Sequence, residues 1–212
     1  FINGPISKKY FLKNKYFGIT EYLAEKTKSN KFAMLIYNKK LSVVPITTHL
    51  PIKMVSRKLK KKEIIDKIQL VNNFYKEKLN KKAYIGVTGL NPHCESIHTY
   101  NEDINLVKPS INYLKNKKLK IEGPFSADTI FLKKNRKQFD IIVGMYHDQV
   151  LTPMKTLNEY DAINITVGLP FIRVSPDHGP NEKMMGKNKS NPLSLLNAIT
   201  FLDKFWSKLK KV

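Results

Sequence analysis

The sequence predicts an α/β fold with a largely parallel sheet, because short apolar runs alternate with longer segments of helical periodicity. The apolar runs are compact and bounded by Gly, Pro or Asn, as buried strands are. In the helical segments, apolar residues recur at spacings of three and four. An apolar content of 42% and a charged content of 26% are globular values, which excludes wholesale disorder.

The expected elements can be placed in order along the chain. Residues 1–5 have the pattern of a strand that ends in a loop. Residues 60–81 form an amphipathic pattern with a lysine-rich outer face, a second helix begins near Pro109, and a third covers 192–209. Further strands are expected at Phe32–Tyr37, Leu41–Ile46, Lys82–Gly86, Phe139–Met145, Ala162–Val167 and Phe171–Val174. The first two of these could form a hairpin.

The formal charge of +21 raises nucleic acids and anionic membranes as partners. However, only three of the 38 basic residues are arginine, the side chain that is favoured for bidentate recognition of phosphates and bases. Lysines are also spread along the whole chain. We therefore interpret the charge as a lysine bias of the solvated surface and expect no nucleic-acid partner. A basic nucleic-acid-binding module is kept as an alternative of a different class.

The remaining bulk features point to a cytoplasmic protein. No apolar run approaches the length of a transmembrane span and no signal peptide opens the chain, so no membrane partner is expected. The single cysteine, Cys94, excludes an internal disulfide and is consistent with a reducing compartment. The chain begins with Phe1 and not with Met, so we expect an N-terminal portion to be missing. Such a fragment could be inactive alone.

Four histidines come directly after apolar runs that are expected to be strands: His49, His93, His147 and His178. In an open α/β sheet, ligands bind at the carboxyl ends of the strands, and imidazole is the commonest ligand of transition metals. A lone histidine at a strand end is more often structural. Several at one edge of a sheet favour a metal site, although the spacing matches no established metal motif.

Four strings of residues are more specific than the histidines alone. In chain order they are Gly123-Pro124-Phe125-Ser126-Ala127-Asp128-Thr129, Met145-Tyr146-His147-Asp148-Gln149, Asn164 to Arg173, and Asp177-His178-Gly179. Together they resemble the 4-hydroxythreonine-4-phosphate dehydrogenase family of pyridoxal phosphate biosynthesis, over essentially the whole chain. The resemblance implies the two-domain α/β/α architecture of isocitrate and isopropylmalate dehydrogenases, here N-terminally incomplete. It also implies a central region over residues 1–160, with metal and dimer-interface residues, and a C-terminal segment over 161–212 that completes the cofactor-side domain.

The activity implied by the resemblance is NAD-dependent oxidation of 4-phosphooxy-L-threonine. The product is a 3-oxo acid that decarboxylates to 3-amino-2-oxopropyl phosphate. The implied metal ligands are His49, His93 and His147, which would hold a divalent cation (Zn, Mg or Co) in a site shared between the subunits of a homodimer. The implied substrate-binding residues are Thr20, Lys155, Asn164 and Arg173, the catalytic ones are Lys155, Asp148 and Asp128, and the cofactor-binding ones are His178 and Gly179.

Two departures from the family pattern bear on these roles. Ile19 precedes Thr20 where relatives commonly have histidine, and Pro180 follows Gly179 where threonine is commoner. The first affects contact with the substrate, because an isoleucine side chain forms no hydrogen bond. The alternative within the same superfamily is therefore a dehydrogenase that acts on a four-carbon sugar acid phosphate. Between Lys155 and Asp148, the identity of the catalytic base stays open.

Overall fold

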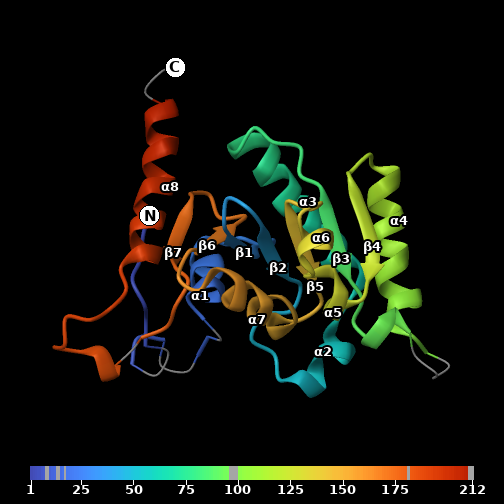
Figure 1. Ribbon diagram of the computed structural model, residues 1–212, viewed down its shortest axis with the longest axis horizontal. Coiled ribbons are helices and arrows are strands. Elements are labelled where there is room, and N and C mark those ends of the chain that lie inside the picture. Colours follow the sequence, from blue (N-terminus) through green and yellow to red (C-terminus); the bar gives the residue numbers. More distant parts are fainter. Residues whose placement is uncertain (8–9, 13–14, 17, 96–99, 181, 210–212) are drawn as a thin grey trace.

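The computed structural model contains one seven-stranded sheet with helices on both faces (Figure 1). It describes residues 1–7, 10–12, 15–16, 18–95, 100–180 and 182–209, without the side chains of 206–209. The strands lie in the order β4-β3-β5-β2-β1-β6-β7. Their bounds are Ala33–Tyr37 for β1, Ser42–Pro45 for β2, Ile85–Thr88 for β3, Ile121–Phe125 for β4, Ile141–Gly144 for β5, Ile163–Val167 for β6 and Arg173–Pro176 for β7.

The sheet is mixed, so the expectation of a largely parallel sheet is wrong for one half of it. Strands β2, β5, β3 and β4 run parallel to one another. Strand β1 is antiparallel to both β2 and β6, and β6 is antiparallel to β7. The reversal arises from the short turn between β1 and β2, because two strands joined by a few residues pair antiparallel. The hairpin that the sequence allowed is thus present.

The helices form a layer on each face of the sheet. Their bounds are Ile19–Lys26 for α1, Ile52–Lys58 for α2, Lys61–Lys78 for α3, Lys108–Asn116 for α4, Ala127–Ile130 for α5, Lys133–Arg136 for α6, His147–Asn158 for α7 and Leu193–Leu209 for α8. Three short helical turns cover Pro92–Cys94, Asp103–Val107 and Glu182–Met184. One buried cluster joins α3, α4 and α8 to one face, and a second joins α7 to the other.

The two long amphipathic helices lie where the periodicity predicts them, as α3 and α8. The helix near Pro109 is also present as α4, although a π-helical turn precedes it. Helices α1 and α7 are not predicted by the periodicity. In α7, Pro153 interrupts the interior, where proline removes a backbone hydrogen bond and usually ends a helix. Burial of Val150, Leu151 and Met154 against the sheet compensates for that loss.

The parallel pairing of β3, β5 and β2 brings the ends of three strands to one edge of the sheet. Gln149, which is buried in the first turns of α7, links two of these ends. Its Oε1 atom accepts hydrogen bonds from Thr88 Oγ1 at 2.8 Å and from the Met145 backbone at 2.7 Å. Its Nε2 atom donates to the Gly89 carbonyl at 2.7 Å. One side-chain amide therefore connects the loops that follow β3 and β5.

The segment after residue 160 continues the same sheet, because β6 pairs with β1 from Ala33 to Tyr37. Ile2 also forms a parallel bridge with Val174 of β7, in agreement with the strand-like pattern of residues 1–5. The proposed division at residue 160 stays a prediction. Within the described residues, every helix is too short or too polar to cross a bilayer.

Gly144 allows α7 to begin directly above the end of β5. A Cβ atom at this position would lie 2.5 Å from Val150 Cγ1 and 3.0 Å from Gln149 Oε1. We expect Gly144→Ala to lower the free energy of unfolding by about 1–3 kcal/mol, since the added methyl group overpacks a closed contact. Urea denaturation measures the loss. Gly4→Ala is the control, because its added methyl group meets no atom within 4 Å and its unfolding midpoint should not change.

Candidate functional site

His49 and His147 lie side by side at the edge formed by the ends of β2 and β5. Their ring centroids are 5.6 Å apart and their planes are inclined by 38°. The register of the two strands explains this placement, because Pro45 pairs with Gly144 and each histidine follows its strand by a few residues. Both side chains are about one-third exposed, at 31% and 32%. The structure therefore brings together two of the three predicted metal ligands.

A carboxylate contacts each of the two imidazoles. Asp148 Oδ1 lies 2.7 Å from His147 Nδ1, which leaves Nε2 of that ring available to a ligand. Glu21 Oε1 lies 3.8 Å from His49 Nδ1 and accepts a hydrogen bond from Thr48 Oγ1. Burial alone would raise the pKa of the Glu21 carboxyl, but the contact with His49 and the other hydrogen bonds outweigh it and the pKa falls below its ordinary value.

His93 follows the neighbouring strand β3 but is not part of the pair. It is exposed and lies in the short turn Pro92–Cys94. Both His93 and Cys94 have left-handed backbone conformations, with φ of 56° and 60°. Asp103 holds the preceding residues, because its carboxylate accepts hydrogen bonds from the Leu90 and Asn91 backbones at 2.5 and 3.0 Å. The third predicted ligand, His93, thus lies apart from the histidine pair, on a loop whose first residues are held by Asp103.

Arg173 is a buried cation beside the histidine pair. Only 1% of it is exposed, and it forms no ion pair with a carboxylate among the described residues. Its Nε donates to Asn3 Oδ1 at 2.7 Å and its Nη1 to Thr166 Oγ1 at 3.0 Å. Burial lowers the pKa of Arg173 to about 10, and the charge of Glu21 opposes that shift, so the guanidinium stays protonated at neutral pH.

Thr20 connects Arg173 to the histidines. Its hydroxyl lies 3.3 Å from Thr166 Oγ1, the same oxygen that Arg173 contacts. Thr20 is buried at the start of α1, and its neighbour Glu21 contacts His49. Ile19, which departs from the family pattern, is the first residue of α1 and does not disrupt the start of the helix. The predicted positions Thr20 and Arg173 therefore form one continuous group with His49 and His147.

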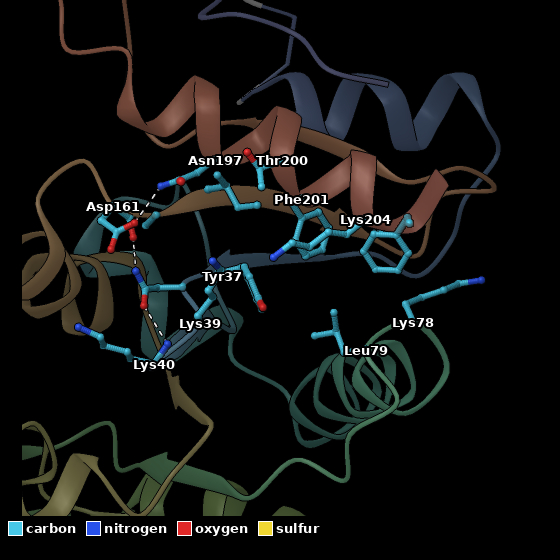
Figure 2. Close-up of a pocket in the computed structure, with 14 residues that line it drawn as sticks. Tyr37, Lys39, Lys40, Lys78, Leu79, Asp161, Asn197, Thr200, Phe201 and Lys204 are labelled. Carbon is cyan, nitrogen blue, oxygen red and sulfur yellow. Dashed lines mark hydrogen bonds between the residues drawn. The ribbon is translucent and has the colours of Figure 1, made fainter. Parts of the chain in front are cut away.

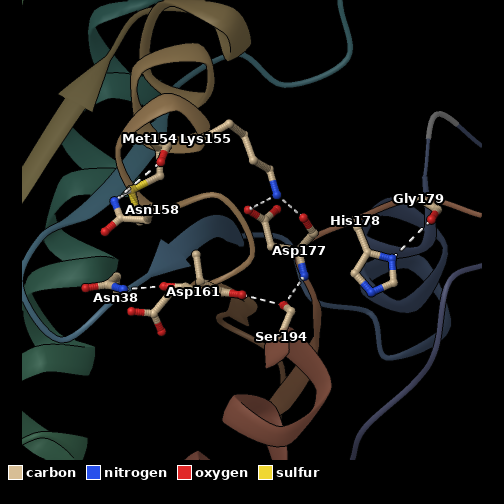
Figure 3. A network of polar contacts seen from close by, with 10 residues as sticks. Asn38, Met154, Lys155, Asn158, Asp161, Asp177, His178, Gly179 and Ser194 are labelled. Carbon is tan, nitrogen blue, oxygen red and sulfur yellow. Dashed lines mark hydrogen bonds and ion pairs between the residues drawn. The ribbon is translucent and has the colours of Figure 1, made fainter. Parts of the chain in front are cut away.

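Lys155 of α7 belongs to a polar network that joins α7 to the end of β7 and to α8 (Figure 3). Its ammonium group donates to the Asp177 carbonyl and forms an ion pair with Asp177 Oδ2 at 2.7 Å. The Asp177 backbone in turn donates to Ser194 Oγ of α8 at 2.9 Å. Burial raises the pKa of the Asp177 carboxyl, although the hydrogen bond from Lys155 acts in the opposite direction. Lys155 thus lies against a carboxyl that holds its proton more tightly than usual.

The other predicted residues are less closely connected. Asn164 lies in β6, two residues before Thr166, and its Oδ1 atom is buried with no hydrogen-bond partner among the described residues. Asp128 is exposed in α5 and has no contact with the histidines in the described part of the chain. His178 and Gly179 are exposed in the loop after β7, where His178 Nδ1 lies 3.1 Å from the Gly179 carbonyl.

Sequence reasoning missed Glu21, Thr166 and Asp177 as members of the site. Glu21 could have been found from its place next to Thr20, and Asp177 from its place next to His178 in the same string. Thr166 lies within the string from Asn164 to Arg173, but a threonine in a strand is ordinary and nothing singled it out there. Its role becomes visible only when β6 lies beside β7 and places Arg173 opposite it.

The donor set fits a divalent metal only in part within one chain. His49 Nδ1 and Glu21 Oε2 are buried polar atoms without a hydrogen-bond partner among the described residues, as expected where a further ligand is needed. Two neutral imidazoles with nearby carboxylates suit Zn²⁺ or a similar ion. However, no group of three or more His, Cys, Asp or Glu side chains in the described ranges is close enough to enclose one.

Comparison with known proteins finds relatives of two related kinds. A 4-hydroxythreonine-4-phosphate dehydrogenase of Sulfurihydrogenibium sp. (strain YO3AOP1) is 44% identical over 200 residues, which cover 92% of this chain and 61% of that protein. A D-threonate 4-phosphate dehydrogenase of Pectobacterium atrosepticum is 37% identical over 185 residues, which cover 87% of this chain and 57% of that protein. The chain thus spans about three-fifths of the length of these relatives.

Solved structures extend the likeness to the fold. The crystal structure of 4-hydroxythreonine-4-phosphate dehydrogenase from Klebsiella pneumoniae superposes with a TM-score of 0.80 at 32% identity, covering 96% of this chain and 63% of that one. Isocitrate dehydrogenase from Methylococcus capsulatus superposes with a TM-score of 0.60 at 10% identity, covering 96% and 67%. The second likeness concerns the fold alone and confirms the expected architecture.

A family model gives the most direct assignment. The model described as pyridoxal phosphate biosynthetic protein PdxA matches residues 1–202. This match confirms the resemblance that the four strings predict. The chain belongs to the PdxA family.

Proposed function

We propose that this chain belongs to a dehydrogenase that oxidises 4-phosphooxy-L-threonine with NAD, in the biosynthesis of pyridoxal 5′-phosphate. The 3-oxo acid formed then loses carbon dioxide to give 3-amino-2-oxopropyl phosphate. The family match and the names of the relatives support this activity. The observation that carries it is the continuous group from His147 and His49 through Thr20 to the buried Arg173.

His49 and His147 would hold a divalent cation, and the exposed His93 would complete the site of a neighbouring subunit. Two facts support this division: the first two rings are adjacent, whereas His93 lies apart on its own loop. The bound cation would supply a Lewis acid for the substrate hydroxyl. Asp148, which is 78% exposed and hydrogen-bonded to His147, orients the imidazole.

Arg173 would bind an anionic group of the substrate. Two of its nitrogens are engaged with Thr166 and Asn3, and Nη2 forms no hydrogen bond to a described residue. A buried guanidinium without a carboxylate partner is costly, and a phosphate or carboxylate of the substrate would compensate its charge. The unpartnered amide oxygen of Asn164, on the same strand as Thr166, could accept a donor such as the substrate amine.

Lys155 is the stronger candidate for the base. Bound NAD would supply the hydride acceptor, and a protein group would take the proton of the substrate hydroxyl. Asp148 is exposed and occupied by His147, whereas Lys155 is paired with a largely buried carboxyl whose pKa is raised. The exposed loop at His178 and Gly179 would approach the dinucleotide.

The competing substrate is a four-carbon sugar acid phosphate. Relatives that carry the name D-threonate 4-phosphate dehydrogenase are 35–37% identical to this chain, which favours keeping this alternative. The two substrates differ at the second carbon, which bears an amine in one and a hydroxyl in the other. A homodimer and a cytoplasmic location stay predictions.

The activity is tested by measuring NAD reduction by the full-length protein with each of the two substrates, before and after metal is removed by a chelator. We expect 4-phosphooxy-L-threonine to be oxidised faster than D-threonate 4-phosphate, with loss of turnover after chelation and recovery with Zn²⁺, Mg²⁺ or Co²⁺. A preference for the threonate would shift the proposal to the competing activity. Turnover that survives chelation would contradict the metal site.

The metal site can be tested without turnover. We expect His147→Ala to weaken binding of Co²⁺, followed by its absorption spectrum or by calorimetry, by more than about 100-fold. Asp148→Asn should weaken binding by about 10-fold, because it removes the group that orients the ring. His178→Ala is the matched control, since it removes an exposed histidine outside the pair. Equal affinity of the His147 variant and the control would refute the assignment.

The shared site predicts that metal promotes dimerisation. Addition of Zn²⁺ should shift the sedimentation coefficient of the protein from monomer towards dimer, or tighten an existing dimer, because ligands from two chains meet at one ion. His93→Ala should remove this effect and leave the fold unchanged, since His93 is exposed. Zn²⁺-dependent dimerisation that persists in this variant would show that His93 is not the shared ligand.

A further inference from the structure

A cavity lies near the turn between β1 and β2, at the end of the sheet opposite the histidine pair. Figure 2 shows the residues that line it. The cavity has a volume of about 430 Å³ and lies between α8, the end of α3 and the turn between β1 and β2. Strand β2 begins two residues after Lys40 of this cavity and ends at Pro45, four residues before His49, so the strand separates the two places. The cavity is therefore distinct from the site of the proposed dehydrogenase.

The floor of the cavity is aromatic. Tyr37 lies against Phe201 with ring centroids 5.0 Å apart, and Phe201 lies against Phe205 at 4.9 Å. Leu79 and Ile163 add aliphatic surface. Phe201 is buried in the core cluster, which fixes the position of the floor. Such a surface suits a flat apolar group, because aromatic rings stack on or meet edge to face with one another.

The rim of the cavity is cationic. Lys39 and Lys40 of the turn, Lys78 of α3 and Lys204 of α8 line it, against the single carboxylate of Asp161. Among the described residues, none of the four ammonium groups forms an ion pair, whereas Asp161 already accepts a hydrogen bond from Asn197 at 2.8 Å. Figure 2 shows these side chains with the Tyr37 and Phe201 rings, with Lys40 and Lys78 extending on opposite sides of the group. Four uncompensated positive charges around one opening attract an anion.

The volume restricts the ligand to a small molecule. Cavities for small ligands typically measure about 300–1,000 Å³ and combine an apolar lining with a few charged groups. The side chains here divide in the same way, because aromatic rings line the floor and lysine ammonium groups line the rim. Lysine binds anions as a point charge without the geometry of a guanidinium, so the site would accept a carboxylate, sulfonate or phosphate.

We propose that this cavity binds a small amphipathic anion, with an aromatic body on Tyr37 and Phe201 and an anionic group among Lys39, Lys78 and Lys204. The inference is independent of the dehydrogenase activity, because it uses none of the same residues.

The probe for this site is 8-anilinonaphthalene-1-sulfonate, which joins aromatic rings to a sulfonate and fluoresces when desolvated. A fluorescence titration at low salt should show saturable binding of one probe per chain. We expect the triple variant K39E/K78E/K204E to raise the Kd at least about tenfold, because the rim becomes anionic. The matched control, K133E/K134E/K137E, has the same net charge and reverses three exposed lysines in and beside α6. Its Kd should change by less than about threefold.

A second variant keeps the charge and fills the space. Thr200 is exposed on α8 and lines the cavity, so Thr200→Trp should occlude the floor and raise the Kd at least about tenfold without disturbing the core. Circular dichroism checks that each variant is folded. The proposal is overturned if the probe binds the K39E/K78E/K204E and Thr200→Trp proteins as tightly as the parent, since binding would then lie elsewhere, for example on the exposed apolar face of α8.

Discussion

The parallel pairing of β2 with β5 is the constraint on which the rest of the site depends. Its register sets Pro45 opposite Gly144, so that the segments after β2 and β5 leave the sheet at the same level. His49 and His147, which these segments carry, therefore lie side by side. Gly144 allows α7 to start immediately, and Gln149 then links the ends of β5 and β3. A shift of one residue in this pairing would turn every side chain to the opposite face and separate the two rings.

The antiparallel half of the sheet serves a different purpose, because it places the start of β7 beside the end of β6. Arg173 begins β7 and pairs with Thr166 near the end of β6, so the guanidinium lies at the same edge as the histidines. A wholly parallel sheet would carry a residue at the start of a strand to the opposite edge. The reversal between β6 and β7 thus brings the guanidinium of Arg173 to the edge where His49 and His147 lie.

The sequence predicted the long elements and the edge, because both follow from local patterns. The periodicity of α3 and α8 is strong, and a histidine after an apolar run lies at a strand end whatever the order of the strands. Strand order, the mixed polarity and the contacts of Glu21, Thr166 and Asp177 depend on pairings between distant segments. Thr20 and Thr166, for example, are 146 residues apart yet their hydroxyls meet. Only the motif resemblance pointed to Thr20 beforehand.

The loop that carries His93 supports the proposal that the metal site is shared between two chains. His93 and Cys94 are consecutive non-glycine residues in the left-handed region, which costs on the order of 1 kcal/mol for each. The Asp103 carboxylate accepts three hydrogen bonds from the residues before them, Leu90 and Asn91. Such an arrangement persists only where the surrounding structure enforces it. A metal held by His49 and His147 would need a further ligand, and His93 is exposed on a strained turn anchored by Asp103. A symmetric pairing of two chains would satisfy both conditions at once, because each chain would give the ligand that the other lacks.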